Sequence, residues 1–243
     1  MPADAPTILA TSGGYRHGDR TLEFGPLVTH AVDLAGATGT PRVCYVGTAG
    51  GDQAYRAAAM HEAARLAGVR LDVLQLFSMP NVEDVAGYVL DHDVVWVDGG
   101  SVANLLAVWR VHGLDDVMRR AWESGVVLAG VSAGSICWHR GGVTDSFGPD
   151  LRPVTNGLGL LPYDNGVHYD SEASRRPAVH RFVAEGLLGE TYCTDDGVGL
   201  HYRGTELVGA VSETRGAAAW VVRPDGGHAV EDRLDTTLLP GAR

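Results

Sequence analysis

Short apolar runs alternate with helix-like patterns along the first 131 residues, and this alternation restricts the fold more than any other feature of the sequence. The runs are bounded by Gly, Asp or charged residues and cover residues 7–10, 42–46, 71–77, 93–97 and 126–131. Between them, apolar residues recur near helical spacing over residues 26–34, 53–66, 82–90, 102–109 and 115–123. Such an order of buried strands and helices predicts a mostly parallel sheet with helices on both faces. It also predicts that ligands bind at the carboxyl ends of the strands.

The second half of the chain has a different texture. Residues 141–169 are rich in Gly, Pro, Asp and Asn and show little periodicity, which predicts a long irregular segment with a functional role. Residues 197–202, 206–211 and 217–222 predict short antiparallel strands that complete the sheet. Because the sequence contains no internal repeat, low-complexity segment or linker, we expect one α/β domain over residues 1–243. The expected architecture is a three-layer sandwich with short antiparallel C-terminal strands.

Charge and hydropathy argue against several classes of partner. The chain has 19 Lys and Arg against 30 Asp and Glu, a formal net charge of −11, and no basic cluster that could bind nucleic acid or an anionic membrane. Its longest apolar run covers only residues 217–222, whereas about 20 apolar residues are needed to cross a bilayer. The N-terminus shows no secretory signal, and the three cysteines are widely spaced. We therefore expect a cytoplasmic protein with reduced thiols.

A G-x-S-x-G motif follows the apolar run at residues 126–131 and precedes a helix-like pattern. The motif is Gly130-Val-Ser132-Ala-Gly134. A sharp strand-to-helix turn needs small residues on both sides of the serine, so that the hydroxyl is exposed and the next backbone N–H faces a bound carbonyl oxygen. The sequence thus predicts Ser132 as a nucleophile. The alternative is a glycine-rich turn in which Ser132 only caps the helix.

A serine nucleophile needs a base that takes its proton and a third group that orients the base. His168 lies downstream in the irregular segment, and Asp145 lies between it and the motif. His201 and His228 are alternative bases, and spacing alone does not choose among them. A second glycine-rich segment, residues 47–51, lacks the spacing of a phosphate loop, so we expect a strand-to-helix turn that lines the pocket.

Four segments of the chain, in the same order, resemble the peptidase E family of serine peptidases. They are residues 94–101 (VVWVDGGS), 130–138 (GVSAGSICW), 141–151 (GGVTDSFGPDL) and 157–172 (GLGLLPYDNGVHYDSE). The resemblance implies a fold like that of class I glutamine amidotransferases and a Ser, Asp, His order of catalytic residues. It assigns Ser132 as the nucleophile, His168 as the general base and Asp145 as the residue that orients His168. Asp150, Asp170 and Glu172 are nearby alternatives to Asp145.

The same resemblance implies further parts of the site. The backbone N–H groups of Gly100 and Ala133 would bind the oxyanion. The family cleaves dipeptides with N-terminal aspartate, whose carboxylate calls for a cation, and Arg175 or Arg176 lies where the family carries a substrate-binding arginine. We expect a small peptide as substrate, neither cofactor nor metal, and a monomer or homodimer.

Three other functions remain open on sequence grounds. A cyanophycinase-like exopeptidase shares the fold and the serine, and it acts on β-linked aspartyl peptides. An α/β-hydrolase esterase would need His201 or His228 with Asp195 or Asp196. The third alternative is a small-ligand binder that has lost turnover.

Overall fold

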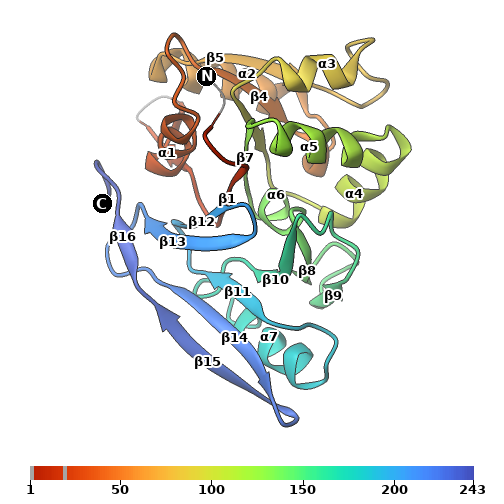
Figure 1. Ribbon diagram of the computed structural model, residues 1–243, viewed down its shortest axis with the longest axis vertical. Helices are drawn as coiled ribbons and strands as arrows, with labels where there is room; N and C mark the ends of the chain where they lie inside the picture. The colour runs from red at the N-terminus through yellow and green to blue at the C-terminus, as the bar shows by residue number, and fades with distance from the viewer. Residues whose placement is uncertain (1–2, 19–20) are drawn as a thin grey trace.

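An eight-stranded sheet forms one half of the molecule (Figure 1). The computed structural model describes residues 3–18 and 21–243. Five neighbouring strands of this sheet are parallel: β5 (Arg70–Leu74), β4 (Arg42–Val46), β6 (Val94–Val97), β7 (Val127–Val131) and β1 (Thr7–Thr11). β12 (Val198–Arg203) pairs antiparallel with β1, and it is followed in the sheet by β13 (Glu206–Ser212) and β16 (Thr236–Leu238).

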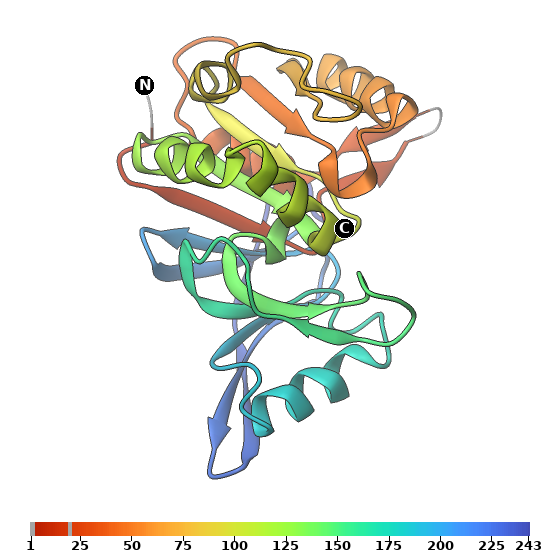
Figure 2. The same ribbon diagram turned by 90° about the vertical axis from the view of Figure 1, so that its right-hand side faces the viewer.

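Helices cover both faces of this sheet, because its parallel strands are apolar on both sides. Along β6, Val94 and Trp96 pack in one core with α1 (Pro26–Leu34) and α2 (Ala54–Ala67). Val95 and Val97 point to the opposite core, with α3 (Val85–Leu90), α4 (Val102–Val111) and α5 (Leu114–Glu123). Figure 2 shows the yellow and green helices and the orange helix α2 separated by the strands. The predicted α/β class with helices on both faces is confirmed.

A second, six-stranded sheet forms the other half of the molecule (Figure 2). Its strands are, in spatial order, β15 (His228–Leu234), β14 (Ala219–Asp225), β11 (Thr191–Thr194), β10 (Leu161–Gly166), β8 (His139–Thr144) and β9 (Arg152–Val154). Helix α7 (Arg175–Ala184) packs against it through Val179 and Phe182. A small hairpin joins β2 (Tyr15–His17) and β3 (Leu22–Phe24).

This second sheet corrects two expectations. The segment of residues 141–169 is not irregular throughout, because it contributes parts of β8, β9 and β10. The C-terminal strands do not all complete one sheet, because β12 and β13 join the large sheet whereas β14 pairs with β11 in the second.

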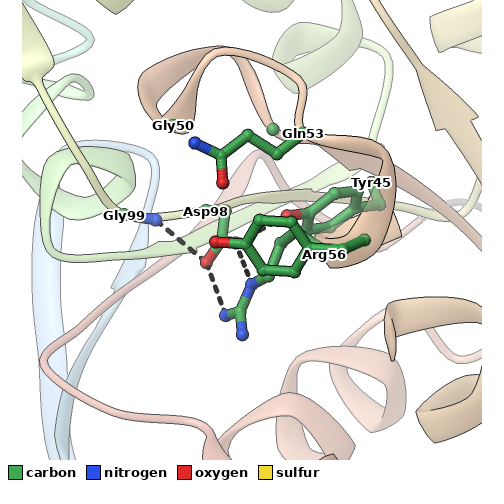
Figure 3. Close-up of a pocket in the computed structure, with 8 residues that line it drawn as sticks. Tyr45, Gly50, Gln53, Arg56, Asp98 and Gly99 are labelled. Atoms are coloured by element: carbon green, nitrogen blue, oxygen red, sulfur yellow. Dashed lines mark hydrogen bonds and ion pairs between the residues drawn. The ribbon is translucent and has the colours of Figure 1, made fainter. Parts of the chain in front are cut away.

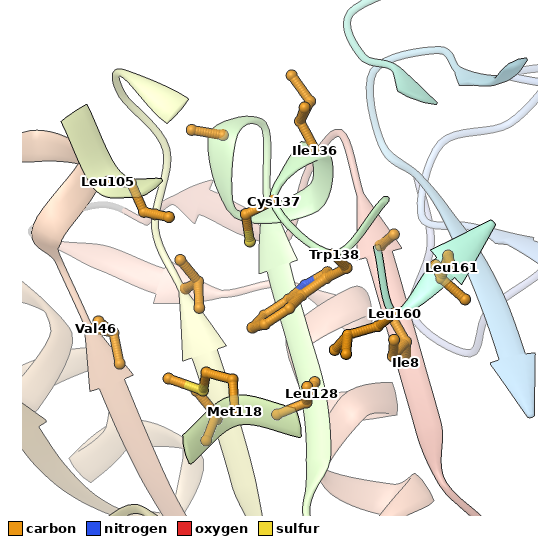
Figure 4. Packing of buried hydrophobic residues seen from close by; sticks show 14 of the residues in the cluster. Ile8, Val46, Leu105, Met118, Leu128, Ile136, Cys137, Trp138, Leu160 and Leu161 are labelled. Atoms are coloured by element: carbon orange, nitrogen blue, oxygen red, sulfur yellow. The ribbon is translucent and has the colours of Figure 1, made fainter. Parts of the chain in front are cut away.

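The strand–turn–helix around the G-x-S-x-G motif is packed from below by one apolar core (Figure 4). Helix α6 (Ala133–Ile136) is short, and Cys137 and Trp138 follow it with no exposed surface. Burial raises the pKa of the Cys137 thiol, and its Sγ lies 3.4 Å from the carbonyl oxygen of Gly134. Cys137 is therefore a packed core side chain.

Candidate active site

Ser132 lies in a strained turn at the carboxyl end of β7. Its φ of 58° and ψ of −112° are unusual for a residue with a side chain, and its amide donates to the Thr11 carbonyl oxygen at 3.0 Å. The flanking glycines are required by packing. A Cβ at Gly130 would lie 2.5 Å from the Gly134 carbonyl oxygen, and a Cβ at Gly134 would lie 2.2 Å from that of Val97. This is the backbone shape that exposes a nucleophilic serine.

His168 comes from the second sheet, two residues beyond the end of β10. It also adopts a positive φ, 54°. Its amide donates to the Ser12 hydroxyl at 3.2 Å, and that hydroxyl is 2.6 Å from the hydroxyl of Thr194. Ser12 follows Thr11, the residue that holds the Ser132 amide. The backbones of Ser132 and His168 are thus fastened to adjacent residues at the end of β1.

Asp196 is the carboxylate that contacts the imidazole of His168. The Nδ1 of His168 and the Oδ1 of Asp196 are 2.6 Å apart. This hydrogen bond is the main cause that lowers the pKa of Asp196, so the carboxylate stays ionised. The amide of Asp196 donates to Asp170 Oδ1 at 2.8 Å, which fixes the turn between β11 and β12. With Nδ1 engaged by the carboxylate, Nε2 is the ring nitrogen left to exchange a proton with a nucleophile.

Asp145, which the sequence resemblance assigned to this role, is placed elsewhere. It is exposed in the turn after β8, where its carbonyl oxygen accepts from the Gly148 amide at 3.1 Å. Within the described chain, no hydrogen bond or ion pair engages its carboxylate. The turn after β8 therefore does not bring Asp145 to His168.

The three neighbouring carboxylates considered as alternatives are also not against the His168 ring. Asp150 is exposed, Asp170 accepts the Asp196 amide, and Glu172 pairs with Arg175. The sequence suggests Asp196 only as a partner of His201 or His228. The signal that could have identified it is its position just after a short run of β-branched and aromatic residues, residues 191–194 (TYCT), which is β11 in the structure.

Two backbone N–H groups are available beside Ser132. The Gly99 amide donates to its neighbour Asp98 at 3.0 Å, but in residues 3–18 and 21–243 the amides of Gly100 and Ala133 have no acceptor. The Gly99–Gly100 turn packs against the serine, since a Cβ at Gly99 would lie 3.3 Å from Ser132 Cβ. The geometry is compatible with the expected oxyanion-binding role of these two groups.

A pocket of about 400 Å³ opens beside this turn (Figure 3). Its lining residues come from the ends of β4 and β6 and the start of α2: Tyr45, Gly47, Gly50, Gln53, Tyr55, Arg56, Asp98 and Gly99. Gly99 belongs both to the pocket wall and to the turn that packs on Ser132. The glycine-rich segment at residues 47–51 lines this pocket through Gly47 and Gly50.

Both arginines predicted to bind substrate already have partners. Arg175 is only 3% exposed, and its Nη1 donates to the Val143 carbonyl oxygen at 2.7 Å while Nη2 pairs with Glu172. Arg176 is half exposed, pairs with Glu231, and stacks with its guanidinium carbon 4.4 Å from the centre of a Trp220 ring. Arg175 thus supports the loop around His168 from within, and Arg176 ties α7 to the β14–β15 hairpin.

The histidine–aspartate pairs that an esterase would need are not formed. His201 stacks edge-on against His30, with ring centres 6.0 Å apart. His228 begins β15 and is exposed. Asp195 accepts from Trp220 Nε1 at 3.0 Å. Neither histidine contacts a carboxylate in the part of the chain that the structure covers.

In residues 3–18 and 21–243, no three or more His, Cys, Asp or Glu side chains are grouped so that they could hold a metal ion. No helix in these ranges is long and apolar enough to span a membrane.

Comparisons with known proteins identify the family of the chain. The family model of peptidase family S51 matches residues 8–209. The uncharacterized peptidase YgaJ of Bacillus subtilis (strain 168) is 41% identical over 182 residues, which cover 75% of this chain and 78% of that protein.

Two solved structures share the fold. A Listeria monocytogenes EGD-e protein assigned to peptidase E has a TM-score of 0.60 and 15% identity, covering 94% of this chain and 98% of that one. A peptidase from an acI-B1 actinobacterium has a TM-score of 0.67 and 15% identity, covering 96% and 95%. From the family match and the YgaJ identity, the chain belongs to peptidase family S51 and is a peptidase.

Proposed function

We propose that the protein is a serine peptidase that hydrolyses dipeptides with N-terminal aspartate. The observation that carries the proposal is the 2.6 Å contact between His168 and Asp196, in a loop whose backbone is fastened beside that of Ser132. A strained serine, an imidazole and an ionised carboxylate are the three groups that acyl transfer to a serine requires.

The proposed mechanism assigns one role to each group. His168 Nε2 takes the proton of the Ser132 hydroxyl as its oxygen attacks the peptide carbonyl carbon. The oxyanion that forms accepts hydrogen bonds from the Gly100 and Ala133 amides. His168 then gives the proton to the departing amine, and water releases the acyl group by the same steps. Asp196 holds the ring and stabilises its charged form.

The aspartate preference comes from the family resemblance, and it needs a local cation because the net charge of −11 repels acidic substrates at long range. Among the eight residues that line the pocket beside Ser132, Arg56 is the basic one, and it is already paired with Asp98. The substrate preference is therefore tested separately from the hydrolysis.

The test is hydrolysis of a matched panel, Asp-Leu, Glu-Leu, Asn-Leu, Ala-Leu and β-Asp-Leu, by the wild-type protein and by Ser132→Ala. We expect cleavage of Asp-Leu and a loss of about four to six orders of magnitude in kcat for the variant. Cleavage of β-Asp-Leu alone would favour a cyanophycinase-like activity. Equal cleavage by the variant, or none by either protein, would contradict the proposal.

A further inference from the structure

Asp98 is a buried carboxylate with four donors around it, directly before the Gly99–Gly100 turn. Arg56 contacts it with two nitrogens, Nε at 2.6 Å and Nη2 at 3.1 Å. The Tyr45 hydroxyl donates at 2.5 Å and the Tyr15 hydroxyl at 3.1 Å. These side chains come from α2, β4 and β2, and they are the titratable groups that hydrogen-bond to Asp98 in the described structure. Figure 3 shows two of them, Arg56 and Tyr45, beside Asp98.

The fourth donor connects this cluster to the serine. Asp98 Oδ1 accepts the Gly99 amide at 3.0 Å, which fixes the orientation of the peptide before Gly100. The turn is also tightly packed at its next residue, because a Cβ at Gly100 would lie 2.3 Å from the Ala49 carbonyl oxygen. The carboxylate thus holds the turn, but it also brings a negative charge within two residues of a proposed oxyanion donor.

A negative charge there opposes the reaction unless it is neutralised. The developing oxyanion and Asp98 would repel each other, and burial strengthens the repulsion because the effective dielectric constant is low. Burial alone would also raise the pKa of Asp98, but hydrogen bonds from Arg56 and Tyr45 outweigh it and keep the pKa below its ordinary value. Asp98 is therefore ionised, and Arg56 is the group that compensates its charge.

We propose that Arg56 is a positioning residue for catalysis, which neutralises Asp98 and keeps it as the acceptor that orients the Gly99–Gly100 turn. This inference rests on the proposed role of Ser132. It differs from substrate binding by Arg56, which would affect KM for substrates that carry a carboxylate. The positioning role affects the reactivity of Ser132 toward any electrophile whose oxygen enters the oxyanion site.

The test measures the second-order rate of Ser132 labelling by a neutral fluorophosphonate, in which Ser132 Oγ bonds to phosphorus and fluoride departs. Arg56→Gln leaves the Asp98 charge uncompensated, and we expect labelling about 10- to 100-fold slower. Asp98→Asn removes that charge and keeps an oxygen for the Gly99 amide. Arg56→Gln with Asp98→Asn should therefore label at least about fivefold faster than Arg56→Gln alone.

Arg42 offers a matched control, because it lies at the start of β4, at the opposite edge of the sheet from Asp98. Arg42 pairs with Asp91 at 2.7 Å, and its side chain is 30% exposed against 28% for Arg56. Arg42→Gln should label at the wild-type rate. Arg56→Lys keeps the positive charge, so Ser132 in this variant should be labelled faster than in Arg56→Gln. This comparison separates the loss of charge from a folding defect in Arg56→Gln.

Two results would overturn the inference. The first is a labelling rate of Arg56→Gln that equals that of the wild-type protein. The second is a labelling rate of the double variant that is no higher than that of Arg56→Gln, when thermal unfolding shows that both variants are folded. An increase in KM confined to acidic dipeptides, with unchanged labelling, would instead make Arg56 a substrate anchor. Failure of the proposed function is distinguishable, because the wild-type protein itself would then not be labelled at Ser132.

Discussion

Replacing Asp196 by Asn tests which carboxylate serves His168. The substitution keeps the size of the side chain and removes its charge, so the imidazolium that forms during the reaction loses its partner. Asp145→Asn is the matched control, because it makes the same chemical change in the exposed turn after β8. The contact of 2.6 Å between His168 and Asp196 predicts a large effect for the first variant and none for the second.

The size of the effect follows from distance and exposure. Two charges about 4 Å apart interact with about 4 kcal/mol near a protein surface and about 1 kcal/mol in water. The Asp196 side chain is 50% exposed and that of His168 is 25% exposed, so the interaction lies between these limits. Since about 1.4 kcal/mol is a factor of ten in rate, Asp196→Asn should lower kcat by about 10- to 1,000-fold. This is less than the roughly 10⁴-fold loss typical of a buried triad aspartate.

The assay is steady-state hydrolysis of the dipeptide that the wild-type protein cleaves best. KM should stay within about threefold of wild type for both variants, because neither carboxylate is assigned to substrate binding. Asp145→Asn should keep kcat within about twofold. A larger loss for Asp145→Asn than for Asp196→Asn would refute the assignment, and it would mean that the turn after β8 moves when substrate binds.

Three other substitutions or conditions test separate parts of the structure. Gly100→Ala forces a Cβ to 2.3 Å from the Ala49 carbonyl oxygen, and it should lower kcat by about 10²- to 10³-fold by moving an oxyanion donor, as measured by dipeptide hydrolysis. Arg175→Met removes a buried guanidinium that donates to Val143, and chemical denaturation should show a loss of about 2–4 kcal/mol in stability. Burial lowers the pKa of His139 to about 4, whereas the pKa of an unfolded histidine is about 6.5. Between these pH values the histidine is protonated in the unfolded chain but not in the folded one, so the free energy of unfolding should fall by about 3 kcal/mol towards pH 4. Denaturation curves should show this decrease, and they should show a smaller decrease for His139→Gln.

The large sheet could be predicted because its parallel strands are buried on both faces. Such strands are compact apolar runs, and the helix from Pro26 to Leu34 and the strand from Arg42 to Val46 have the bounds that the pattern predicts. Where an observed element begins at a different residue from the predicted one, a local side-chain contact explains the difference. The helix predicted from residue 82 begins at Val85, because Asp84 caps it by accepting the Gly87 amide at 2.8 Å.

The pattern predicts the strand that becomes β14, but it does not predict a separate second sheet, because β8, β9 and β10 carry a weaker signal. β10 reads Leu-Pro-Tyr-Asp-Asn-Gly, and its buried polar residues are explained only by partners distant in sequence. Asn165 donates to the Tyr192 carbonyl oxygen at 2.9 Å, and Asp164 pairs with Arg140. A sequence pattern shows that these residues are polar but does not show their partners. From the sequence alone, β10 therefore has the pattern of a loop.

The same limit explains why the sequence indicates Ser132, but not Asp196 beside His168, as a candidate site residue. Ser132 depends on its own turn, where the glycines on both sides carry the signal. Asp196 lies where the chain passes from β11 of the second sheet to β12 of the large sheet. The Ser12 amide donates to the Val198 carbonyl oxygen at 2.9 Å, and the Ser12 carbonyl oxygen accepts the Gly197 amide at 2.9 Å. The Ser12 hydroxyl is also 2.6 Å from the hydroxyl of Thr194 in β11. These bonds hold the turn after β11 against the end of β1, next to the residue that holds the Ser132 amide. The carboxylate that contacts His168 is thus set by the junction of the sheets, and sequence distance from His168 is a poor guide to it.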